Sequence, residues 1–278
     1  MRRIAPNVYL ETKYPGVQLG AVVTDDGLFL IDSPARADDG RDWLVALSEY
    51  GKPRYLALLD SHPDRVLGAR IFDFPIVAHD WTLETMSNWT DSFKGSARPI
   101  GAEVDSLKRI TSVRKAVPEL AFSDQMVIHL GDRPINLLHR PGPTPGSIWV
   151  VFPEAKVAFI GDAVTVAEPP FLGEADIEYW LTSLDDLRKG RMRSYKLISS
   201  RDGPIKPENI NDMARFLRKI PWRLERLAEA GAPPEEAGDL ASELMKDFKV
   251  PKARHDQVLL RLEVGLTRLY SRYYTDDA

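Results

Sequence analysis

Short apolar runs separated by turn residues dominate the first two hundred positions of the chain. Runs of this kind, bounded by Gly, Pro and Asp, are typical of β-strands. They occupy residues 8–10, 17–23, 28–31, 55–59, 75–78, 126–130, 135–139, 148–152, 157–160 and 197–199. Apolar residues at helical spacing predict helices over 38–50, 80–90 and 174–189. The first part of the chain is therefore expected to mix strands with helices.

After Pro207 the pattern becomes helical alone. Apolar residues recur at steps of three and four, first at Ile210, Met213, Leu217, Ile220, Leu224 and Leu227, and again at Leu259, Leu262, Leu266, Leu269 and Tyr273. Pro221 interrupts the first stripe and should kink or divide that helix. We therefore predict a domain over 1–206 and a helical extension over 207–278 packed on it. The stripes either pack on that domain or form the seam of a homodimer.

Composition adds mainly exclusions. Hydrophobic residues make up 44% and charged residues 28% of the 278 positions, which is ordinary for a soluble globular protein. A net charge of -4 argues against nucleic-acid binding. The absence of cysteine excludes disulfides and thiolate metal sites. No run approaches the ~18 apolar residues of a membrane span, and no apolar segment follows Arg2 and Arg3, so we expect a cytoplasmic protein.

Candidate chemistry gathers where polar residues follow strands. Asp60, His62 and Asp64 alternate directly after the run at 55–59, so their side chains are expected to converge if this segment is extended. Carboxylate and imidazole groups are good ligands for a divalent cation. Taken alone, the segment favours a loop with surface carboxylates and one histidine over a metal site. Similar polar segments occur at 141–147, 161–162 and 201–204.

The order of these segments resembles the metallo-β-lactamase superfamily across roughly residues 4–206. Asp60 to Arg65 stands at the place of the His-x-His-x-Asp-His signature, and Pro141 to Ser147 is similar to a Pro-Gly-His-Thr-Pro-Gly-Ser loop. Phe159 to Asp162 resembles the strand that carries a bridging aspartate, and Ser200 to Ile205 stands where the family has Pro-Gly-His-Gly-Pro. The resemblance implies an α/β fold, a four-layer αβ/βα sandwich with a C-terminal helical extension.

The resemblance also implies a set of metal ligands, which we compare position by position. His62, Asp64 and Asp162 are the family's own residues, whereas Asp60 and Asp202 replace histidines and keep an oxygen that can coordinate. Pro143 replaces another histidine and offers no side-chain donor. Arg65 replaces a further one, and its guanidinium stays protonated and cannot coordinate a cation. Metal binding is therefore expected at Asp60, His62, Asp64, Asp162 and Asp202, with occupancy left open.

Two functions follow from this degenerate site. The first is a hydrolase that uses one divalent ion (zinc, manganese or iron) on a small ester, thioester, lactone or phosphodiester, with Asp64 as general base. The second is a catalytically inactive member in which Arg65 takes the place of an ion and the pocket only binds a small-molecule ligand or a partner. The polar segment 91–117 is either a lid over the site or a plain surface loop.

Overall fold

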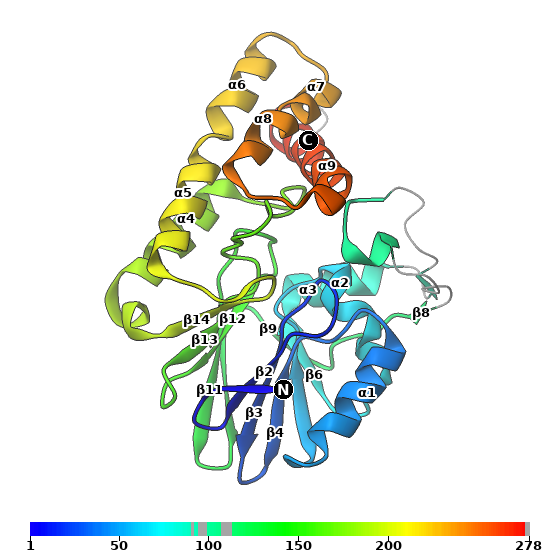
Figure 1. The fold of residues 1–278 in the computed structure, drawn as a ribbon, viewed down its shortest axis with the longest axis vertical. Helices are drawn as coiled ribbons and strands as arrows, with labels where there is room; N and C mark the ends of the chain where they lie inside the picture. The colour runs from blue at the N-terminus through cyan, green and yellow to red at the C-terminus, as the bar shows by residue number, and fades with distance from the viewer. Residues whose placement is uncertain (90–91, 94–98, 107–112, 276–278) are drawn as a thin grey trace.

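The computed structural model describes residues 1–89, 92–93, 99–106 and 113–275 (Figure 1). Two β-sheets stand side by side in the lower half of the view, and the C-terminal helices lie above them. Much of the predicted lid, residues 94–98 and 107–112, lies outside the described residues.

The first sheet is built from the N-terminal strands. In the described part of the chain it has seven strands in the order β1-β2-β3-β4-β5-β6-β9. These are β1 (Arg2–Ala5), β2 (Val8–Glu11), β3 (Leu19–Thr24), β4 (Gly27–Ile31), β5 (Pro53–Ala57), β6 (Ile76–His79) and β9 (Leu120–Phe122). Strands β1 to β4 are antiparallel, and β4, β5, β6 and β9 are parallel. The segments that follow the parallel strands therefore emerge at the same edge of the sheet.

The second sheet follows in the chain. Over the described residues it has six strands in the order β10-β11-β12-β13-β14-β15. They are β10 (Gln125–Leu130), β11 (Arg133–His139), β12 (Ile148–Phe152), β13 (Val157–Phe159), β14 (Lys196–Ser199) and β15 (Gly203–Pro204). Strands β13 and β14 are parallel, so the turns after them lie together. A separate short pair joins β7 (Ser92–Phe93) to β8 (Val113–Arg114).

Helices cover the outer faces of both sheets. The α-helices are α1 (Ala37–Leu47), α2 (Pro63–Val66), α3 (Asp80–Asn88), α4 (Ile177–Arg188), α5 (Pro207–Arg218), α6 (Pro221–Glu229), α7 (Pro234–Asp239), α8 (Ala241–Leu244) and α9 (His255–Tyr273). Short 3-10 turns occupy η1 (Leu67–Ile71), η2 (Glu103–Ser106), η3 (Gly190–Ser194), η4 (Met245–Asp247) and η5 (Lys252–Arg254).

Three apolar clusters explain this layering. Between the sheets, inward-facing residues such as Phe29 and Phe152 meet edge to face, with ring centroids 6.2 Å apart. The outer face of the first sheet packs against Trp43 of α1, which has no exposed surface. The outer face of the second sheet packs against Trp180 of α4. Each buried side chain of this size contributes roughly 1.5–3 kcal/mol. The predicted four-layer αβ/βα sandwich is confirmed.

The C-terminal helices continue the outer layer of the second sheet. Their apolar stripes, apart from the exposed Tyr273, belong to the same cluster as the sheet residues Trp149 and Ala158, with Leu217 and Leu262 fully buried. Pro221 divides the first stripe as expected, since α5 ends at Arg218 and α6 begins at Pro221. No helix in the described residues is long and apolar enough to cross a membrane.

Candidate functional site

The site lies where the segments after β5, β13 and β14 meet. The first segment is not extended as expected: after His62 the chain turns into α2. His62 caps that helix because its Nδ1 accepts a hydrogen bond from the backbone N–H of Asp64 (3.2 Å), and Pro63 stands at the first helical position. The helix turns the next two side chains, Asp64 and Arg65, into the buried interior.

Arg65 lies at the centre of the site with no exposed surface. Its Nη2 donates to Oδ2 of Asp162 over 2.5 Å, and its Nη1 lies 3.3 Å from Oδ2 of Asp60. Its backbone carbonyl accepts a hydrogen bond from the Ser33 hydroxyl (2.9 Å). The guanidinium thus joins the two carboxylates that the resemblance assigns to a metal ion.

A second guanidinium, which we did not predict, enters from the turn after β14. Arg201 Nη1 donates to Asp64 Oδ2 (2.8 Å), and its Nε donates to the same Asp162 oxygen that binds Arg65 (3.3 Å). Its Nη2 lies 3.2 Å from Nε2 of His62. The signal was present in the sequence, because Arg201 is a long charged residue where the resembled loop has glycine.

Asp202, next to Arg201 in the chain, directs its carboxylate to backbone groups. Its carboxylate accepts hydrogen bonds from the backbone N–H groups of Val166 (2.9 Å) and Ala167 (3.1 Å), and so fixes the loop after Asp162. The Asp64 carboxylate also accepts hydrogen bonds from the backbone N–H groups of Glu103 (3.2 Å) and Val104 (2.9 Å), and so it connects η2 to the site. Of the predicted residues, the structure therefore brings together Asp60, His62, Asp64, Arg65 and Asp162.

Burial and the two guanidinium groups set the charges. Burial, and then the charge of Arg201, lower the pKa of His62 to about 3, so the imidazole is neutral at pH 7. Burial acts to raise the pKa of Asp162, but Arg65 and Arg201 outweigh it and hold that pKa below its usual range. For Asp60 burial dominates over Arg65, and the pKa is raised.

These residues do not fit a metal ion. Among the residues that the structure describes, no group of three or more His, Asp or Glu side chains is arranged to hold one. Oδ2 of Asp60, Asp64 and Asp162 each contacts Arg65 or Arg201 instead. Since a guanidinium keeps its proton and repels cations, the donor set is that of an ion-pair network.

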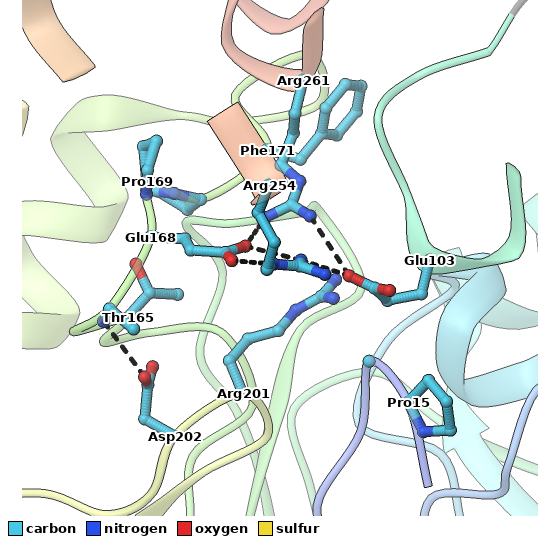
Figure 2. Close-up of a pocket in the computed structure, with 13 residues that line it drawn as sticks. Pro15, Glu103, Thr165, Glu168, Pro169, Phe171, Arg201, Asp202, Arg254 and Arg261 are labelled. Atoms are coloured by element: carbon cyan, nitrogen blue, oxygen red, sulfur yellow. Dashed lines mark hydrogen bonds and ion pairs between the residues drawn. The ribbon is translucent and has the colours of Figure 1, made fainter. Parts of the chain in front are cut away.

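A cavity of about 280 Å³ opens beside this network. Figure 2 shows three arginines on its wall, Arg201, Arg254 and Arg261, one above another between Glu168 on one side and Glu103 on the other. Arg254, at the end of η5, pairs with both glutamates, and Arg261 of α9 pairs with Glu168 over 3.0 Å. The C-terminal helices thus contribute two charged residues that we did not predict, because only the folded chain places them near the site.

Comparisons with known proteins agree with this fold. The profile of the family described as the Metallo-beta-lactamase superfamily matches residues 17–198. The chain belongs to this superfamily.

Three similar proteins show how far the likeness extends. A metallo-beta-lactamase family protein from Thermus thermophilus is 18% identical, with a TM-score of 0.64 over 98% of this chain and 94% of its own. The sec-alkylsulfatase Pisa1 from Pseudomonas sp. is 18% identical with a TM-score of 0.70; the match covers 98% of this chain but 49% of that enzyme. A stretch of 52 residues is 40% identical to acyl-coenzyme A thioesterase MBLAC2 of Bos taurus. The stretch covers 19% of this chain and 19% of that protein. The structural likenesses concern the fold alone.

Proposed function

We propose that this chain is a metal-independent member of the superfamily that binds a small-molecule ligand in the cavity beside Arg201. In this proposal Arg65 and Arg201 neutralise the buried carboxylates that would otherwise hold metal ions. The observation that carries it is the single Asp162 oxygen, which accepts from Arg65 at 2.5 Å and from Arg201 at 3.3 Å.

Electrostatic magnitudes support this assignment. At an effective dielectric of ~20, a guanidinium about 4 Å from a divalent ion repels it by roughly 8 kcal/mol. That repulsion is comparable to the binding free energy of a micromolar site, about 8 kcal/mol. With two guanidinium groups in contact with the carboxylates, an ion would have to displace both side chains before it could bind.

Metal content of the purified protein tests the proposal. We expect far less than one equivalent of zinc, manganese or iron by elemental analysis. The double variant Arg65→His, Arg201→Gly removes both charges and restores residues that the resembled motifs contain, so we expect it to bind zinc or manganese more tightly. Arg70→His is a matched control, because it adds a histidine at an exposed position. Near one equivalent of metal in the unsubstituted protein would overturn the proposal.

A metal-dependent hydrolase is the second candidate, and the short likeness to a thioesterase favours it. Asp60, His62 and Asp162 would then hold one ion, and Asp64 would act as general base. This function requires Arg65 and Arg201 to leave their present partners. It predicts bound metal in the unsubstituted protein, together with hydrolysis of a thioester such as acetyl-coenzyme A that Asp60→Ala abolishes.

A further inference from the structure

Two buried side chains on the cavity wall have unused hydrogen-bonding atoms. Among the described residues, Nη2 of Arg261 and Oγ1 of Thr165 have no hydrogen-bond partner. The nearest carboxylate oxygen paired with that Nη2 is Oε1 of Glu103, at 3.9 Å, which is too far for a hydrogen bond. Arg261 is 3% exposed and Thr165 is 5% exposed, and both line the cavity. A buried polar group without a partner is unfavourable, so an atom of this kind calls for a partner such as a water, an ion or a ligand.

The carboxylates on the same wall are already engaged. Glu168 accepts from Arg254 and Arg261, and Glu103 accepts from Arg254. The Asp202 carboxylate accepts two backbone N–H groups. The unused capacity is therefore on the donor side, since a guanidinium nitrogen can only donate and a hydroxyl can donate.

The wall carries three arginines and three carboxylates, so a preference for a negative partner depends on the local surroundings of Arg261. Arg261 is buried close to Arg201, and after burial itself the positive charge of Arg201 is the largest influence that lowers the Arg261 pKa. An oxyanion that accepts from Arg261 would give Nη2 the hydrogen bond that Glu103 does not supply at 3.9 Å, and it would offset the repulsion between the two guanidinium groups.

The rest of the cavity is apolar and small. Phe171, Pro169 and Pro170 line it beside the arginines, and its volume of about 280 Å³ is near the lower limit for small-molecule sites. A ligand of matching shape has a charged head and a short apolar body.

We propose that the cavity binds a small organic anion, whose oxyanion head accepts hydrogen bonds from Arg261 and Thr165 and whose short apolar body contacts Phe171. This inference rests on the proposed ligand-binding function and names its ligand class.

Titration calorimetry with two probes tests it. Hexanoate and hexanamide have nearly the same size, and only the first carries a charge. We expect hexanoate to bind at least about tenfold more tightly than hexanamide. Thr165→Val keeps the side-chain shape and removes the hydroxyl, so it should weaken hexanoate binding about three- to tenfold. Arg261→Met should weaken it more than tenfold, and Arg218→Met, at an exposed position of α5, should leave it unchanged.

The outcomes separate this inference from the proposed function. No hexanoate binding, equal binding of the two probes, or full affinity in Thr165→Val would overturn the oxyanion site even if the protein is free of metal. Bound metal in the unsubstituted protein, with hexanoate binding that depends on Thr165, would overturn the metal-independent function and leave the oxyanion site standing. If Arg261→Met does not fold, Thr165→Val and the comparison of hexanoate with hexanamide still test whether the oxyanion site exists.

Discussion

At the residue scale, three buried carboxylates are held together by two arginines. Arg65 contacts Asp60 and Asp162, and Arg201 contacts Asp64 and Asp162. A buried carboxylate without a partner is strongly unfavourable, and breaking a buried ion pair by removing one partner typically costs about 3–5 kcal/mol. Loss of either arginine should therefore destabilise the folded state. The intact network need not stabilise the fold more than apolar side chains of similar volume would.

Asp32 gives this network a pH dependence. Its carboxylate accepts from the backbone N–H of Leu59 (2.9 Å) and from the Ser200 hydroxyl (3.0 Å), and burial, opposed by Arg65, raises its pKa from 3.8 to about 7. Between these values the folded state holds a proton that the unfolded state has lost, so the free energy of unfolding falls as pH rises.

We expect Asp32→Asn to remove that loss of stability. The amide oxygen can still accept from Leu59, and the amide nitrogen can donate to the Ser200 hydroxyl. Urea unfolding at pH 5 and pH 8 should show that the unsubstituted protein loses more stability across this interval than Asp32→Asn does. Asp25→Asn, at an exposed turn, should behave like the unsubstituted protein. An equal loss in Asp32→Asn would show that Asp32 does not titrate there.

The sequence predicted the site residues that follow strands, but not the arginines that come from later in the chain. Asp60, His62, Asp64, Arg65 and Asp162 follow strands in known motifs, and their convergence depends only on where those strands end. Arg254 and Arg261 could not be placed, because they lie more than fifty positions after Arg201 on helices whose packing direction has no local signal. Arg201 could have been predicted, because this charged residue lies within the loop at 200–205 that resembles a family motif.

At the element scale, helix ends and turns differ most from expectation. The predicted helix over 174–189 is α4, Ile177–Arg188, and it begins later because the Asp176 side chain caps it by accepting from the Tyr179 N–H. The segment after β5 was expected to be extended, but Pro63 and the His62 cap favour a helical turn. Apolar periodicity identifies elements, whereas side-chain caps determine where they begin.

Gly142 tests the packing of the loop that precedes β12. Its φ is +152°, and a Cβ at this position would lie 2.7 Å from Cα of Trp180, which is backbone and cannot move aside. We expect Gly142→Ala to lower the free energy of unfolding by roughly 2 kcal/mol or more, by backbone strain together with the clash. Gly231→Ala is the matched control, because φ there is +68° with nothing within 4 Å.

The comparison separates clash from strain. Gly231→Ala should lower the free energy of unfolding by about 1 kcal/mol, the usual penalty of left-handed backbone without a clash. Equal losses in the two variants, measured by urea unfolding, would mean that α4 can shift to make room for the added methyl group.

At the scale of the whole molecule, the C-terminal helices complete both the core and the cavity. Their apolar stripes join one buried cluster with α4 and the second sheet within one chain, and Arg254 and Arg261 reach the cavity from η5 and α9. A homodimer through these helices stays a proposal, and it would have to use surfaces other than the buried leucines. The proteins from Thermus thermophilus and Pseudomonas cover 98% of this chain, helices included.

This arrangement predicts that residues 1–206 will not fold on their own. Without α5 to α9, helix α4 and the loop before it would expose part of the apolar cluster that they share with these helices, because α4 packs on α5 and Leu172 lies against Gly265 of α9. An exposed apolar patch of that extent favours aggregation. We expect a chain ending at residue 206 to be insoluble, or soluble with strong dye binding and no cooperative thermal transition, whereas a chain ending at Thr275 melts like the full protein. A soluble 1–206 fragment with a cooperative transition would show instead that the domain folds independently and that the helices only add the two cavity arginines to it.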